Sequence, residues 1–136
     1  MKKQGWVSFW LGNIKVEDSI GEYVDLTYDE DGESVPSKFF MDFNIDMDET
    51  DEDTIEKAVY KNSSSDIYTL LAGCSYEEII IPQFKESIDL KKSYNAVILI
   101  YNFEYNNEIT STNDFDFITT TNYEKKTLIS MENRLN

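Results

Sequence analysis

The chain has 136 residues, about the size of one domain, and its 40% hydrophobic and 14% aromatic content excludes intrinsic disorder. It carries 27 acidic and 12 basic residues, a net charge of −15, which disfavours binding to nucleic acid or to an anionic membrane. Sixteen of the acids lie between Glu17 and Glu56 with Lys38 as the only base, so this window holds the entire net charge. Such a block creates a directional field, and we expect a single domain over residues 1–136 whose partner is a basic protein.

Two features bear on the location of the protein. The apolar run after the first lysines is too brief for the core of a signal peptide or for a membrane span. Cys74 is the only cysteine, and it cannot form an internal disulfide, which is compatible with a reducing compartment. We therefore expect a cytoplasmic protein in which Cys74 is a buried, inert thiol.

The first predicted element is a strand over residues 5–12, because its side chains alternate between two faces. The two sets are Val7, Phe9 and Leu11, and Trp6, Ser8 and Trp10. Both faces are largely apolar, so the strand is expected at the centre of a sheet. Its tryptophans are then expected in the core and not on a ligand platform.

A short amphipathic helix is predicted next, because Val16, Ile20 and Val24 recur at a spacing of four residues. Gly21 weakens this helix, since glycine has a low helix propensity. An acidic turn follows at residues 29–33, where charged residues and a glycine lie together.

A second short helix is predicted after this turn, with Ser34 as the residue that caps its first backbone amides. Its apolar face would carry Val35, Phe39 and Phe43. Pro36 is compatible with this helix because it falls in the first turn, where no backbone donor is needed.

Residues 54–61 fit two structures. Ile55, Ala58 and Val59 suit one face of a helix with acids at its positive end, whereas Ala58 and Tyr60 suit an alternating strand. The sequence leaves both possibilities open.

A third helix is predicted to begin at Ser65, with Ile67, Leu70 and Leu71 on one side. Gly73 follows as the left-handed residue that ends it.

The serine and glutamates of residues 75–78 then predict a capping box at the start of a further helix. Pro82 limits or kinks this helix, and Phe84 and Ile88 would continue its buried side. Alternatively, the three isoleucines at 79–81 form a strand, because β-branched residues favour one.

The clearest strand lies at residues 96–101, which are apolar on both faces and therefore central. Alternation resumes at residues 115–119, so residues 96–123 read as a long antiparallel hairpin. The predicted fold class is therefore α+β, with a small, mostly antiparallel sheet and short helices between its first and last strands.

The sequence offers little catalytic chemistry. It contains no histidine, which removes the commonest general base and the commonest transition-metal ligand. The turn that ends at Gly32 resembles a calcium loop, but Thr27 and Lys38 stand where its first and closing carboxylates belong. We therefore predict no catalytic residues, no metal site and no cofactor.

Five segments together resemble the immunity protein 22 family of bacterial polymorphic toxin systems. They are Val7-Ser8-Phe9-Trp10-Leu11-Gly12, Asp29-Glu30-Asp31-Gly32, Pro36-Ser37-Lys38-Phe39, Leu70-Leu71-Ala72-Gly73 with Ser75-Tyr76, and Tyr101-Asn102-Phe103-Glu104-Tyr105. The resemblance implies a cytoplasmic protein that binds and neutralises a cognate toxin domain, without catalysis.

The charge block supplies an independent reason for such a role. Nuclease toxins carry basic clefts for phosphate, and an acidic protein can occupy such a cleft after rapid, electrostatically steered association. The residues expected to form or border the toxin-binding surface are Asp29, Glu30, Asp31, Glu33, Asp46, Asp48, Glu49, Asp51, Glu52 and Asp53.

Two other functions fit the same composition. An acidic adaptor or nucleic-acid mimic would bind several basic proteins instead of one toxin. A carboxylate-dependent enzyme would need an acid of strongly raised pKa in a deep pocket. The acidic residues are equally compatible with a solvated loop that binds nothing.

Overall fold

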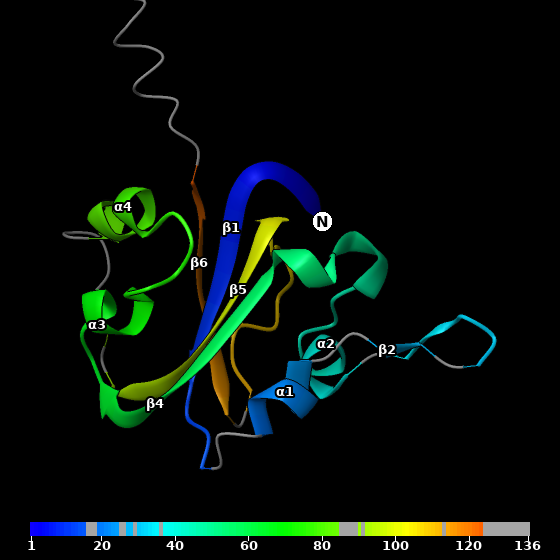
Figure 1. The fold of residues 1–136 in the computed structure, drawn as a ribbon, viewed down its shortest axis with the longest axis horizontal. Helices are drawn as coiled ribbons and strands as arrows, with labels where there is room; N and C mark the ends of the chain where they lie inside the picture. Colours follow the sequence, from blue (N-terminus) through cyan, green and yellow to red (C-terminus); the bar gives the residue numbers. More distant parts are fainter. Residues whose placement is uncertain are drawn as a thin grey trace, which may run out of the picture.

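A computed structural model describes residues 1–15, 19–24, 27–28, 30–35, 37–84, 90, 92–112 and 114–123. The centre is a four-stranded sheet in the order β4-β5-β1-β6, and every neighbouring pair is antiparallel (Figure 1). The strands are β1 (Lys2–Gly12), β4 (Ile55–Ser64), β5 (Tyr94–Phe103) and β6 (Phe115–Asn122). The predicted α+β class and the central position of the first strand are confirmed.

The predicted hairpin over residues 96–123 is wrong. β6 pairs with β1 and not with β5, so Trp10 of β1 lies opposite Ile98 on one side and Phe117 on the other. The reason is that β1 is buried on both faces and can satisfy both of its backbone edges only between two neighbours. β5 and β6 therefore run parallel to each other, on either side of β1.

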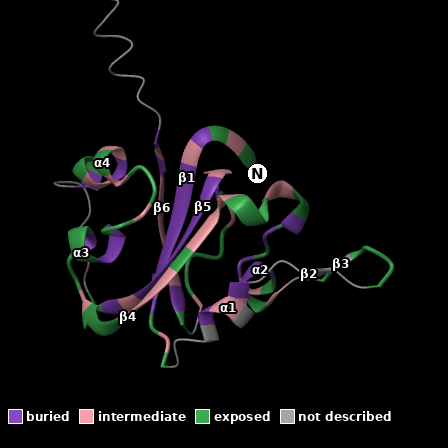
Figure 2. Cartoon of the chain, viewed as in Figure 1, coloured by how far each residue is buried: buried purple, intermediate pink, exposed green. Residues whose placement is uncertain are grey.

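Short helices cover the two faces of the sheet (Figures 1 and 2). α1 (Ser19–Val24) and α2 (Lys38–Asp42) lie on one face, with their buried side chains Ile20, Val24, Phe39 and Phe40. α3 (Ile67–Leu71), α4 (Glu77–Ile80) and the 3-10 helix η3 (Ile81–Phe84) lie on the other. None of the helices in the described part of the chain is long and apolar enough to cross a bilayer.

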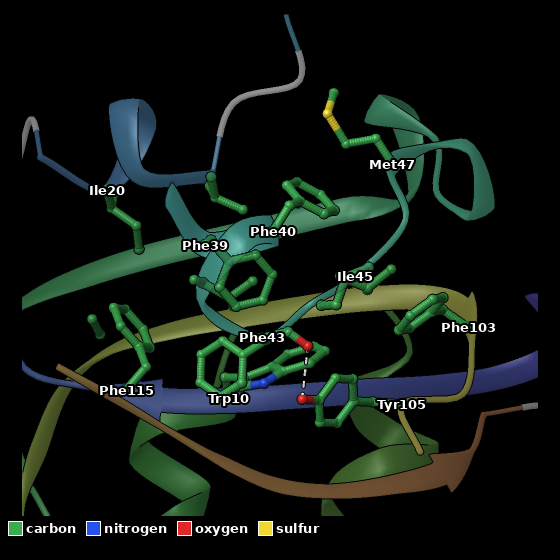
Figure 3. Close-up of a cluster of buried hydrophobic side chains, with 14 residues drawn as sticks. Trp10, Ile20, Phe39, Phe40, Phe43, Ile45, Met47, Phe103, Tyr105 and Phe115 are labelled. Carbon is green, nitrogen blue, oxygen red and sulfur yellow. Dashed lines mark hydrogen bonds between the residues drawn. The ribbon is translucent and has the colours of Figure 1, made fainter. Parts of the chain in front are cut away.

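The core on the α1–α2 face is built around Trp10. Its ring packs edge-on against Phe39 at 4.9 Å and against Tyr105 at 5.3 Å, measured between ring centroids (Figure 3). The Tyr105 hydroxyl donates a hydrogen bond of 2.9 Å to the backbone oxygen of Phe43. Trp10 is thus a core residue as predicted, whereas Trp6 is only half-buried, with the Lys3 ammonium 4.4 Å from its ring centroid.

The second predicted helix begins later than expected. Ser34 and Val35 form the short strand β3 (Ser34–Val35), which pairs with β2 (Thr27–Tyr28), and the helix starts at Lys38 with Ser37 at its N-cap position. Val35 is 43% exposed and does not share the buried face of α2, because its backbone is held in the ladder. The prediction that Ser34 caps this helix is therefore wrong.

The two open assignments are settled. Residues 54–61 are mostly strand β4, in which Ala58 and Tyr60 pack on the core that faces α3. Residues 79–81 are helical, so the strand alternative is wrong, and the change from α4 to a 3-10 helix occurs at Ile81, just before Pro82.

The third helix begins at Ile67, two residues later than predicted. Asp66 occupies its N-cap and accepts a hydrogen bond from the Tyr68 amide. Gly73 has a φ of +87°, which confirms the predicted left-handed stop. Phe84 is buried as expected, and Ile88 lies outside the described residues.

Candidate partner-binding surface

Six of the predicted acidic residues lie in one segment, residues 46–53, which we call the acidic loop. It contains the 3-10 helix η1 (Met47–Glu49) and the first two residues of a second, η2 (Glu52–Thr54). Asp46 caps the first by accepting from the Asp48 amide at 2.9 Å, and Asp51 caps the second by accepting from the Asp53 amide at 3.3 Å. Two of the carboxylates therefore shape the loop itself.

Further contacts hold the acidic loop against the body of the protein. Met47 is 5% exposed and reaches the core beneath α2, while the hydroxyls of Thr50 and Thr54 donate back to the backbone at 3.0 and 2.7 Å. Glu49 pairs with the amino-terminal ammonium at 2.8 Å. The loop thus has a defined shape from which the outward carboxylates, Asp48, Glu52 and Asp53, project into solvent.

The other predicted residues lie elsewhere. Glu30, Asp31 and Glu33 are exposed in the turn between β2 and β3, where Gly32 adopts a φ of +80°. Figure 1 shows this turn at the tip of a ribbon that extends away from the sheet and from the acidic loop. Asp29 lies outside the described residues. The structure therefore divides the predicted surface into two separate acidic segments.

A groove of about 370 Å³ opens where the acidic loop leads into β4. One wall is β4, with Glu56, Ala58 and Tyr60, and the other is the turn between α3 and α4, which we call the α3–α4 turn. The floor comes from the buried side chains Val97 and Leu99 of β5. The groove is thus largely apolar, and the charged residues in its lining are Glu56 and Lys57.

Glu56 is the carboxylate in the lining of this groove, and hydrogen bonds from two other residues hold its side chain in place. It accepts from the Ser75 amide at 3.0 Å, from the Ser75 hydroxyl at 2.6 Å and from the Tyr101 hydroxyl at 2.7 Å. Burial alone would raise the pKa of Glu56, but these donors outweigh burial and lower it below the ordinary 4.5. Glu56 is therefore ionised at neutral pH.

This network corrects the predicted capping box at residues 75–78. The Ser75 hydroxyl donates to Glu56 instead of accepting from a backbone amide of the following helix, and Tyr76 occupies the N-cap of α4 without a capping side chain. Glu77 reaches back to the Gly73 amide at 2.6 Å. No local pattern could have revealed the partnership, because Ser75 and Tyr101 lie 19 and 45 residues from Glu56.

An aromatic cluster flanks this network. The ring of Tyr76 lies 4.7 Å from that of Tyr123, and the ring of Tyr101 lies 5.2 Å from Tyr123. Tyr76 is 49% exposed and has a φ of +62°, a conformation that a bulky side chain adopts at an energetic cost. A rigid, partly exposed aromatic residue is typical of protein interfaces.

Cys74 lines the same groove, but its thiol is not poised for nucleophilic chemistry. Burial, followed by the negative charge of Glu56, raises the pKa of Cys74 to about 11. The thiolate is therefore scarce at neutral pH, and the predicted inert character of this cysteine is consistent with its surroundings.

A second hollow, of about 350 Å³, separates the start of β1 from the acidic loop. Lys2 and Lys3 line one side, and Glu49 and Asp51 line the other. Charges of both signs face each other here, so this hollow offers no field of a single sign to a charged ligand. Among the described residues, no three acidic, cysteine or histidine side chains come together in a way that could hold a metal ion.

The comparisons with known proteins point to one family. A family model described as Immunity protein 22 matches residues 7–124, a range that includes most of β1 and all of β4, β5 and β6. No curated protein matches the chain, and no solved structure matches it.

Proposed function

The chain belongs to the Immunity protein 22 family, whose members are toxin-neutralising proteins, and from this premise we propose that it binds a cognate bacterial toxin domain through the acidic loop. The family match supports the general role. The choice of surface is supported by the exposed carboxylates of Asp48, Glu52 and Asp53, which project from a loop held by its own caps and by Met47.

The physical basis of the proposal is the concentration of charge. The window from Glu17 to Glu56, which includes the acidic loop, carries the net −15 of the chain, so a basic toxin surface is attracted to the protein from a distance. Steering of this kind raises the association rate and falls with ionic strength. A loop that is already ordered also loses little conformational freedom when it binds.

We propose that inhibition is steric and electrostatic and involves no catalysis by this chain. A toxin that acts on a nucleic acid needs a basic cleft for phosphate, and the acidic loop would occupy that cleft in the cytoplasm of the producing cell. The inhibitor then competes with substrate for the same cationic side chains. A nuclease is therefore the toxin class that this surface fits best.

The experiment that tests the proposal is growth of cells that express the toxin domain encoded beside this gene, with and without this protein. We expect growth to be restored by this protein and not by an unrelated acidic protein of similar size and charge. Continued growth arrest, with the toxin shown to be active and this protein shown to be soluble and folded, would overturn the proposal.

A further inference from the structure

The groove between β4 and the α3–α4 turn has features that its role in the fold does not explain. Glu56 carries an ionised carboxylate in a wall that is otherwise formed mainly by aliphatic and aromatic side chains. Gly73 lies on the opposite wall, and a Cβ atom placed there would meet nothing within 4 Å, so the space above it is open. An open, largely apolar groove with one fixed negative charge matches a long side chain that is apolar along its stem and cationic at its tip.

Resting on the proposed function, we propose that this groove receives the side chain of an arginine of the toxin domain, with its guanidinium group against the Glu56 carboxylate. The methylene stem would lie along Ala58 and over the floor formed by Val97 and Leu99. The arginine would thus act as an anchor residue that fixes the register of a complex first formed by the acidic loop.

The carboxylate has capacity for such a partner. Its two oxygens offer about four acceptor positions, of which Ser75 and Tyr101 use three. These donors are hydroxyl and amide groups, which orient the carboxylate without neutralising its charge. Because the donors hold Glu56 in place, the site is preorganised and loses little entropy when a cation binds.

Arginine fits this groove better than lysine. A guanidinium group is planar and weakly hydrated, so it can lie against apolar and aromatic walls such as that formed by Tyr60. An ammonium group is strongly hydrated, so it loses more hydration free energy than a guanidinium group when it enters a half-enclosed groove. Lys57 also contributes to the lining of the groove, but strand alternation in β4 directs its side chain to the face of the sheet opposite that of Glu56.

The position of the groove also connects it to the acidic loop. Glu56 follows Asp53 by three residues, so a toxin steered by the loop meets the mouth of the groove as its next contact. The exposed ring of Tyr76 lies on the same side, next to Tyr101, whose hydroxyl contacts Glu56. The arrangement has the composition of an interface hot spot, a charged anchor site bordered by a rigid aromatic residue.

The test measures the affinity of purified variants for the toxin domain encoded beside this gene. Ala72→Trp fills the groove from an exposed position, and Glu56→Gln removes its charge. Glu78→Gln is the matched control, because it removes one charge from the exposed surface of α4. We expect both groove variants to lose affinity on the order of 30-fold, the cost of a hot-spot residue, and the control to bind like the wild type.

A second measurement keeps this proposal separate from the toxin-binding proposal. NMR chemical shifts of the backbone amides of the wild type are followed during titration with N-acetyl-arginine methylamide. The neutral citrulline analogue serves as the control. We expect saturable shifts at Gly73, Cys74 and Ser75 with the arginine compound alone, and their loss in Ala72→Trp. The groove proposal would be overturned if Ala72→Trp bound the toxin domain as tightly as the wild type, or if both compounds caused equal shifts. Neither outcome would affect the toxin-binding proposal, which is tested separately by the growth experiment. Saturable shifts of equal size in a third titration, with N-acetyl-lysine methylamide, would overturn the choice of arginine.

Discussion

At the scale of single residues, Glu56 shows how one carboxylate can connect distant parts of a fold. Its donors come from the α3–α4 turn and from β5, so it links three segments of the chain. The same donors favour the charged form over the neutral form. The contribution of Glu56 to stability must therefore depend on pH.

We predict that the stability advantage of the wild type over Glu56→Gln declines in acid. Because the folded pKa of Glu56 lies below 4.5, its stabilising contribution is fully present above that value and is lost as the pH falls through the folded pKa. Urea unfolding at about pH 7 and at progressively lower pH checks this. Glu78→Gln serves as the control, and a constant difference between the wild type and Glu56→Gln would contradict the prediction.

At the scale of elements, the close packing of β1 between its two neighbours depends on Gly12. A Cβ atom at this position would lie 2.5 Å from the Asp114 backbone oxygen and 2.5 Å from the ring of Phe115. The backbone cannot easily move away, because the same Asp114 oxygen accepts from the Asn13 amide at 2.9 Å. Gly21 in α1, by contrast, has nothing within 4 Å of an added Cβ.

We predict opposite effects for two identical substitutions. Gly12→Ala should lower the free energy of unfolding by about 1–3 kcal/mol, because the added methyl group overpacks the junction of β1 and β6. Gly21→Ala should raise it by about 0.5–1 kcal/mol, because alanine favours the helix and the space is open. Thermal or urea unfolding of both variants measures the difference. A neutral Gly12→Ala would show that the β1–β6 contact is looser than described.

The elements that the sequence predicted well are those whose pattern is local and long. Residues 5–12 and 96–101 alternate or are continuously apolar, and both became central strands. The predictions that failed concern residues whose partners are distant in the sequence. Ser75 has the local signature of a helix cap, but a carboxylate on β4 takes its hydroxyl, and residues 115–119 pair with β1 although β5 is nearer in sequence.

The candidate site was predictable to a similar extent. The acidic composition of residues 46–53 is visible in the sequence, and the structure adds that Asp46 and Asp51 also cap the two 3-10 helices. The groove was not visible, since its walls come from β4, β5 and the α3–α4 turn. A concave site formed by several segments has no signature in any one of them.

At the scale of the whole molecule, the asymmetric charge is the property most directly open to test. The outward carboxylates of the acidic loop that serve no cap are Asp48, Glu52 and Asp53. Reversing their charge alters the field on one side of the protein without removing a cap. The same number of exposed acids elsewhere, Glu78, Glu108 and Asp114, provides a control of equal net charge.

We predict that the triple variant Asp48→Lys, Glu52→Lys and Asp53→Lys associates with the toxin domain at least about tenfold more slowly at low salt. Its rate should also depend less on ionic strength, because steering is lost. Stopped-flow association at several salt concentrations measures both effects. The control triple variant should retain most of the wild-type rate, and equal slowing of the two would indicate a general effect of net charge.

The position of β1 between β5 and β6 has a consequence for when the protein becomes active. β1 is the first of these strands to leave the ribosome, and its two neighbours are the last, so the sheet cannot close until residues 115–122 have been translated. Pairing over such sequence separations also tends to be slow. We therefore expect the complete sheet to form only after nearly all of its strands have been synthesised.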